Sequence, residues 1–202
     1  MNHLKITAIV TLAFFLLTLS CVFATEPATA KILILYYSRT GKTKLACETL
    51  QKPLGATLLE IKDLKDRSGR WGFFTGALAS LFGMHTEIEP EHPDLAPYSC
   101  IILASPVWTG KLSPAIRTLI AKNRFDGKKV VLFTTTNAFE KEEAKEKAKA
   151  LITEQGGKAL GYYQVTSMKK VKDKKIERTD DEIITDTLKF VPEIQKIFSS
   201  QN

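Results

Sequence analysis

The most promising residues for chemistry form a short polar loop after an apolar run, Ile32 to Tyr37. The loop consists of Ser38, Arg39, Thr40, Gly41, Lys42 and Thr43. A helical pattern follows, because Thr43, Ala46, Cys47 and Leu50 fall at positions i, i+3, i+4 and i+7. Hydroxyls beside the unpaired N–H groups of a helix N-terminus bind phosphate well, and a glycine lets the backbone approach the ligand. The spacing fits neither Gly-x4-Gly-Lys-Ser/Thr nor Gly-x-Gly-x-x-Gly, and ordinary turn and capping geometry is the alternative interpretation.

A second loop of the same kind follows another apolar run, Ile101 to Ala104. Its residues are Ser105, Pro106, Val107, Trp108, Thr109 and Gly110. A helix is predicted to follow, with Ser113 as its cap and Pro114 at its first position. No periodic pattern assigns Trp108 to a core, so the indole either lies over a flat ligand ring or folds onto its own domain. Ligands of open parallel sheets bind where strands end, which makes both loops candidates for one site.

The rest of the chain alternates between strand and helix patterns, which predicts an α/β fold in one domain. The five predicted strands are 32–37, 56–61, 101–104, 130–135 and 159–165. One helix is predicted from alanine and aliphatic positions at Ala144, Ala148, Leu151 and Ile152, and is expected to end at Gly156-Gly157. The last helix is predicted to start with a capping box at Thr179 and Glu182, to bury Ile184, Leu188 and Val191, and to kink at Pro192.

The two loops and their contexts resemble those of flavodoxins and flavodoxin-like FMN proteins over about residues 31 to 198. The Ser-x-Thr-Gly-x-Thr loop is similar to the family's FMN-phosphate loop, and Ser-Pro-Val-Trp-Thr-Gly to its isoalloxazine loop with a stacking aromatic residue. The resemblance implies FMN as cofactor. It also implies a three-layer α/β fold with an open parallel sheet of five strands in the order 2-1-3-4-5 and helices on both faces.

The same resemblance assigns a third loop, after the fourth strand, to the other side of the flavin ring. The residues that it implies are Thr135, Thr136, Asn137 and Phe139. The family's frequent Gly-Asp and Tyr elements are absent from this loop. Phe139 therefore either replaces the second aromatic residue or acts as a hydrophobic staple at the start of the next helix.

Residues 66–93 form an unusual connection, because glycines punctuate an aromatic stretch that an apolar run follows. This segment is either a lid or partner surface beside the flavin, or a short extra helix packed on the sheet edge. His85 and His92 lack the neighbouring Cys or His residues that a metal site would need, and we predict no metal site.

The N-terminus predicts export. Residues 1–24 have the charged start, apolar stretch and small-residue end of a signal peptide, with a short extension at 25–30 before the FMN-binding domain at 31–202. Cys21 also permits processing as a lipoprotein, and an uncleaved anchor is a further alternative. We therefore expect a periplasmic or cell-envelope protein. Because no Arg-Arg pair precedes the apolar stretch, FMN would be acquired outside the cytoplasm.

The chain is basic, with a formal net charge of +7, of which the predicted leader supplies one lysine. Flavodoxins, by contrast, are typically acidic near their flavin. Six basic residues lie close together before the last helix: Lys169, Lys170, Lys172, Lys174, Lys175 and Arg178. This cluster either docks an acidic redox partner, lies against anionic lipid or is a solvated loop. Nucleic acid is not an expected partner, because no aromatic or helical recognition element accompanies these lysines.

Three functions are compatible with these patterns. The first is an electron carrier whose FMN passes electrons to a partner protein or a small-molecule acceptor. The second is an FMN-dependent NAD(P)H:quinone or flavin oxidoreductase, and the third an FMN-free binding domain. We assign no catalytic residue, because the sequence contains no apparent Ser-His-Asp, Cys-His or paired-carboxylate arrangement that would indicate a hydrolase.

Overall fold

The computed structural model describes residues 31–65, 72, 74–75, 78, 82–139 and 141–200. The predicted signal peptide, the extension at 25–30 and most of the aromatic part of segment 66–93 lie outside these residues. Among the helices that are described, none is long and apolar enough to cross a membrane.

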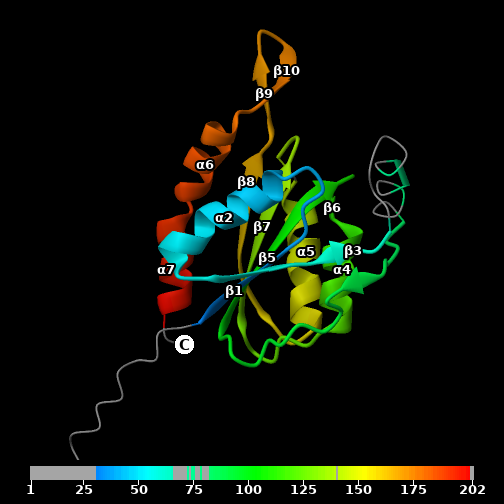
Figure 1. Ribbon diagram of the computed structural model, residues 1–202, viewed down its shortest axis with the longest axis vertical. Helices are drawn as coiled ribbons and strands as arrows, with labels where there is room; N and C mark the ends of the chain where they lie inside the picture. The colour runs from blue at the N-terminus through cyan, green and yellow to red at the C-terminus, as the bar shows by residue number, and fades with distance from the viewer. Residues whose placement is uncertain are drawn as a thin grey trace, which may run out of the picture.

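A parallel sheet forms the centre of the domain (Figure 1). Its strands are β1 (Ile32–Tyr36), β2 (Thr57–Glu60), β5 (Cys100–Trp108), β7 (Lys129–Thr136) and β8 (Lys158–Thr166). They lie in the order β2-β1-β5-β7-β8 and every neighbouring pair is parallel. The predicted strand order 2-1-3-4-5 is therefore confirmed.

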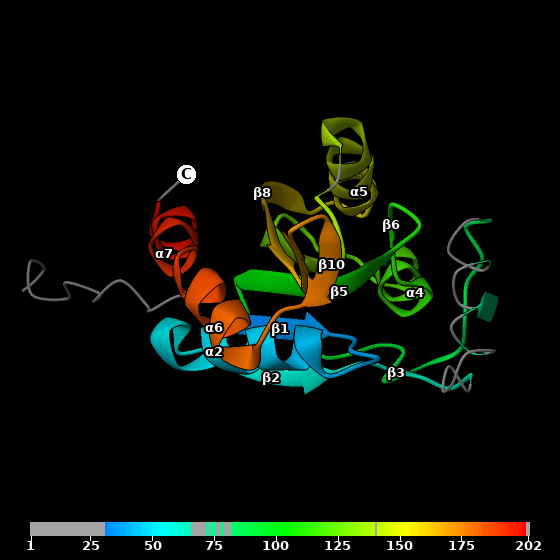
Figure 2. The ribbon, with the colours of Figure 1, turned by 90° about the horizontal axis from the view of Figure 1, so that it is seen from above.

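Helices cover both faces of this sheet (Figure 2). Helices α2 (Lys42–Leu54), α6 (Asp180–Leu188) and α7 (Val191–Ser199) lie on one side, and α4 (Pro114–Lys122) and α5 (Glu142–Glu154) on the other. Each side has its own hydrophobic core. Along β1, Leu33 and Leu35 belong to the core that contains α4 and α5, whereas Ile32 and Ile34 belong to the other. A strand buried on both faces needs apolar residues at every position, which explains the continuous apolar run in the sequence.

Strand β5 extends four residues beyond the predicted strand at 101–104. Its end turns back through Thr109 and Gly110 into β6 (Lys111–Leu112), which pairs antiparallel with Val107 and Trp108. Thr109 and Gly110 both have positive φ angles, of 52° and 74°, as a two-residue hairpin turn requires. The predicted second loop is thus a hairpin at the end of the central strand.

The predicted last helix is two helices. Helix α6 starts at the predicted capping box and ends at Leu188, and α7 begins at Val191 with Pro192 in its first turn, where proline is tolerated. The prediction that Ile184 and Leu188 point inward was wrong, because α6 buries Ile183 and Thr187. The Thr187 hydroxyl donates to the carbonyl oxygen of Ile183 at 2.8 Å, so burial of this polar group leaves no unpaired hydroxyl.

Two small antiparallel sheets complete the described part of the fold. Strands β3 (Lys62–Asp63) and β4 (Ile88–Glu89) pair at the two ends of the segment between β2 and β5. Strands β9 (Met168–Val171) and β10 (Lys174–Glu177) form a hairpin where the sequence suggested a basic loop. Figure 1 shows this hairpin projecting beyond the sheet. The thiols of Cys47 and Cys100 are both buried and free.

The turn after α5 generates a prediction about stability. A Cβ atom at Gly157 would lie 2.7 Å from Cγ2 of Ile152 and 3.0 Å from Cβ of Phe125, both fully buried residues. We expect Gly157→Ala to lower the free energy of unfolding by about 1–3 kcal/mol through overpacking, as measured by chemical denaturation. The loss should shrink in an Ile152→Ala background, which vacates the space. An equal loss in both backgrounds would argue against this steric cause.

Candidate functional site

A cavity of about 530 Å³ opens at the carboxyl ends of β1, β5 and β7. All three predicted loops contribute to its walls. The lining residues are Arg39, Thr40, Lys42, Pro106, Val107, Trp108, Thr109, Gly110, Thr135, Thr136, Asn137, Ala138, Phe139, Lys141, Ala144 and Ser167. The structure therefore brings together loops that lie about 100 residues apart in the sequence.

Four of the predicted site residues are not among the lining residues. They are Ser38, Gly41, Thr43 and Ser105. Four lining residues were not predicted: Ala138, Lys141, Ala144 and Ser167. Ser167 directly follows β8, so the rule that identified the other loops, that strand ends meet at one edge, would also have indicated it. No pattern marked Lys141 and Ala144, which reach the cavity because α5 begins there.

The first loop presents the N-terminus of α2. Gly41 is the capping residue and has a φ angle of +88°, a left-handed conformation that favours glycine. Its N–H donates to Oγ of Ser38 at 3.1 Å, so Ser38 fixes the turn. Because Gly41 provides no side chain to cap the helix, the first N–H groups of α2 remain available to an anion.

Lys42 connects this loop to the end of the basic hairpin. Its ammonium group lies 3.0 Å from Oδ1 of Asp180 and 3.3 Å from Oε1 of Glu177. The hydrogen bond that Lys42 donates to Asp180, and then the one that it donates to Glu177, raises the pKa of Lys42. Lys42 therefore carries its charge at the cavity wall while two carboxylates partly balance it from outside.

Thr43 ties the first loop to the third one. Its side chain is buried and its hydroxyl lies 2.7 Å from the hydroxyl of Thr135 on β7. The structure thus places the Thr43 hydroxyl within the protein rather than at the cavity surface. Thr135 itself lines the cavity.

Ser105 supports the second loop in a similar way. It is fully buried, accepts a hydrogen bond from the N–H of Ser113 at 2.9 Å, and has its hydroxyl 3.0 Å from that of Ser113. Ser113 is the capping residue of α4. The bonds between these two serines close the base of the β5–β6 hairpin that carries Trp108.

Trp108 lines the cavity but is only 8% exposed. Its indole meets the Tyr37 ring edge-on, with ring centroids 5.9 Å apart, and it belongs to the core on the α4 and α5 side. Trp108 thus has features of both alternatives that the sequence left open. Most of its side chain packs onto its own domain, and the remaining surface lines the cavity. Contact with a ligand ring stays a prediction.

The third loop is held by β8. The Ser167 hydroxyl lies 2.8 Å from Oδ1 of Asn137, and its backbone N–H donates to the carbonyl oxygen of Thr136 at 2.8 Å. Phe139 is 73% exposed and lines the cavity, which argues against the alternative that it packs as a staple on α5. The cavity thus has aromatic side chains on two different loops.

The electrostatics of the cavity favour an anion. Its lining includes the cationic side chains of Arg39, Lys42 and Lys141, and no carboxylate is among the lining residues that the structure describes. Among the described residues, no group of three or more His, Cys, Asp or Glu side chains is placed to hold a metal ion. Hydroxyls, helix N–H groups and cations form a donor set suited to phosphate, and the aromatic surfaces suit a flat ring.

Comparison with solved structures identifies the fold. A flavoprotein of Lactobacillus acidophilus in complex with FMN is 24% identical to this chain, covers 67% of it and 93% of its own length, and superposes with a TM-score of 0.56. The apo-form of the flavoprotein from that organism is 25% identical, with 67% and 91% coverage and a TM-score of 0.54. Oxidised flavodoxin 2 of Bacillus cereus is 19% identical, with 83% and 99% coverage and a TM-score of 0.50.

No protein-family model matches the sequence, and no curated protein matches it. The strand order, the two helical layers and the similarity to these solved structures agree with one another. The chain has the flavodoxin-like fold.

Proposed function

We propose that this protein binds FMN in the cavity at the strand ends and acts as an electron-transfer flavoprotein outside the cytoplasm. The observation that carries the proposal is the convergence of an uncapped helix N-terminus, cationic side chains and two aromatic residues on one cavity, whose described lining residues include no acidic side chain. The FMN complex of the Lactobacillus acidophilus flavoprotein supports it. When bound, FMN supplies the capacity to accept and release electrons, which none of the protein's side chains provides at this site.

The residues divide this task between the two ends of the ligand. The N–H groups at the start of α2, with Thr40 and the charges of Arg39 and Lys42, would bind the phosphate. Trp108 and Phe139 would contact the ring and restrict its access to water. Since the cavity lies at the carboxyl ends of the strands, a partner could reach a ring held there without any opening of the core.

An FMN-dependent NAD(P)H:quinone or flavin oxidoreductase is the second candidate. A further cavity of about 380 Å³ shares Gly110, Lys141 and Ala144 with the first one. Its lining combines the apolar side chains of Leu112, Ala148 and Leu151 with four basic side chains and with the carboxylate of Glu143. Space for a second substrate beside the flavin site is what an oxidoreductase needs.

Matched threonine substitutions test the phosphate site. Thr40→Val removes a hydroxyl from the cavity wall, so binding of FMN should weaken by about 1–3 kcal/mol, while riboflavin, which lacks phosphate, should bind almost unchanged. Thr43→Val removes the partner of the buried Thr135 hydroxyl instead. It should lower the free energy of unfolding by about 1–3 kcal/mol and leave the ratio of FMN to riboflavin affinity unaltered.

Absorbance or fluorescence titration with the two flavins, together with chemical denaturation, measures both effects. Equal losses of FMN and riboflavin binding in Thr40→Val would contradict the phosphate assignment. Failure of the wild-type protein to bind FMN would overturn the proposed function as a whole.

Reduction kinetics separate the carrier from the oxidoreductase. We expect NADH and NADPH to reduce the FMN-loaded protein slowly and dithionite to reduce it quickly, because the sequence contains no second dinucleotide-binding motif. Stopped-flow absorbance at the flavin band measures both rates. Rapid, saturable oxidation of NAD(P)H with a quinone as acceptor would favour the second candidate.

The proposed location has its own test. Protein isolated from the native host should begin at Thr25, or at a lipid-modified Cys21, and should fractionate outside the cytoplasm. N-terminal mass spectrometry on cell fractions measures this. A cytoplasmic protein that retains Met1 would be incompatible with export.

A further inference from the structure

The basic hairpin β9–β10 begins at the wall of the cavity. Ser167, the residue before β9, lines the cavity, and its N–H donates to the carbonyl oxygen of Thr136 at 2.8 Å. At the other end of the hairpin, the N–H of Arg178 donates to the carbonyl oxygen of Ser167 at 2.9 Å. Both strands of the hairpin are therefore fixed beside the proposed flavin site.

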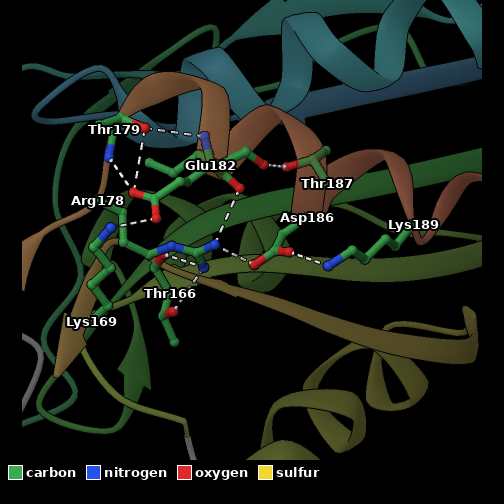
Figure 3. A network of polar contacts seen from close by, with 9 residues as sticks. Thr166, Lys169, Arg178, Thr179, Glu182, Asp186, Thr187 and Lys189 are labelled. Atoms are coloured by element: carbon green, nitrogen blue, oxygen red, sulfur yellow. Dashed lines mark hydrogen bonds and ion pairs between the residues drawn. The ribbon is translucent and has the colours of Figure 1, made fainter. Parts of the chain in front are cut away.

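A polar network holds the base of the hairpin against α6 (Figure 3). The guanidinium of Arg178, whose side chain is only 14% exposed, lies 2.6 Å from Oδ2 of Asp186 and donates to the carbonyl oxygen of Glu182 and to the hydroxyl of Thr166. The carboxylate of Glu182 also binds Lys169. Lys189, and then Arg178, lower the pKa of Asp186. These bonds fix the direction in which the hairpin projects.

The six basic residues that the sequence grouped together therefore have different roles. Arg178 and Lys169 belong to the anchor, and Lys170 forms an exposed ion pair with Asp173. Lys172, Lys174 and Lys175 are exposed and form no ion pair with any residue that the structure describes. Of the six, these three are the exposed cations that have no ion-pair partner among the described residues.

The hairpin keeps these charges at a cost to its own stability. Lys170 and Lys175 are directly opposite each other in the register, and like charges in that position are destabilising. The turn residues Lys172 and Asp173 have φ angles of 46° and 63°, in the left-handed region that residues with a Cβ atom adopt at a cost. Packing within the protein does not explain this arrangement, because all four residues of β10 are exposed.

We propose that hairpin β9–β10 is a docking arm for an acidic partner protein that exchanges electrons with the flavin. The proposal rests on the proposed function, since it names the partner of that same site. In the exchange, the reduced centre of the partner loses one electron and the flavin gains it. Opposite charges would steer the partner to the hairpin and so bring its redox centre to the mouth of the cavity.

The distribution of residues on the hairpin favours a protein over a membrane surface. Lys174 and Lys175 are adjacent in β10 and thus point to opposite faces of the ribbon, whereas a flat bilayer would meet one face. Val171 is directly opposite Lys174 in the register, and Ile176 lies two residues after Lys174 and opposite Lys169, so both apolar side chains share a face with Lys174. Val171 is 43% exposed and Ile176 is 40% exposed. Apolar contact surface flanked by charge is typical of protein interfaces.

Charge reversal with a matched control tests the docking arm. The hairpin variant carries Lys172→Glu, Lys174→Glu and Lys175→Glu, and its new glutamate at 175 faces Lys170, which favours folding of the hairpin. The control carries Lys31→Glu, Lys52→Glu and Lys158→Glu, three exposed lysines at the other end of the sheet. Both variants have the same net charge, so only the position of the change differs.

The probe is a [2Fe–2S] ferredoxin of net negative charge, titrated into FMN-loaded and FMN-free protein at low ionic strength. Calorimetry gives the affinity, and stopped-flow absorbance gives the rate at which the reduced ferredoxin reduces FMN. We expect the hairpin variant to lose affinity and rate by roughly tenfold or more and the control by about twofold. FMN affinity should be the same in all three proteins, since none of the six lysines lines the cavity.

Several results would overturn the docking arm. Equal losses in both variants would show that only net charge matters, and no loss in the hairpin variant, or no association of the wild type with ferredoxin, would remove its basis. Sedimentation with vesicles of phosphatidylcholine and phosphatidylglycerol that depends on the hairpin, while ferredoxin binding does not, would assign it to membranes. Association of the FMN-free protein tests the arm even if the chain does not bind FMN, so the two proposals fail separately.

Discussion

Burial of the parallel sheet on both faces is the constraint from which the other features of this protein follow. Strands β1, β5 and β7 lie between two helical layers and are almost entirely apolar until they reach their carboxyl ends. Along these strands, polar side chains therefore gather at the carboxyl ends and in the loops that follow. Because parallel strands end at the same edge, these loops meet without any direct sequence relation between them. The cavity is a consequence of that arrangement.

The sequence predicted this arrangement where a pattern had one physical meaning. Continuous apolar runs beside helical patterns indicated a parallel sheet, and the polar residues after them indicated the cavity wall. The resemblance of two loops supplied the strand order, which the structure confirms. Residues such as Lys141 and Ala144 escaped prediction because they reach the cavity through the direction of α5, which depends on packing rather than on local sequence.

Other details could not be predicted because they depend on contacts between polar groups that are distant in the sequence. The hydroxyl of Thr43 reads as a phosphate ligand from sequence, yet it bonds to Thr135, which is 92 residues away. The sequence indicated a single cluster of basic residues before α6, yet Arg178 forms an ion pair with Asp186 and is largely buried. In both cases the residue was identified from its type, but its role depends on a contact partner that the sequence pattern does not indicate. In α6, the buried residues are Ile183 and Thr187, one position before those predicted, and the hydrogen bond from the Thr187 hydroxyl to the carbonyl oxygen of Ile183 allows this polar residue to be buried.

Lys42 shows how the proposed flavin site and the hairpin are physically joined. Its ammonium group lies at the cavity wall and is held by Glu177 at the end of β10 and by Asp180 at the start of α6. These carboxylates partly balance its charge, so attraction of an anion to the cavity would depend more on the N–H groups of α2 than the count of cations suggests. The same ion pairs connect the hairpin to the first loop of the cavity. A partner that docked on the hairpin would therefore contact an element whose last residue, Glu177, pairs with a lysine of the cavity wall, while the charges proposed for docking, on Lys172, Lys174 and Lys175, lie outside the cavity.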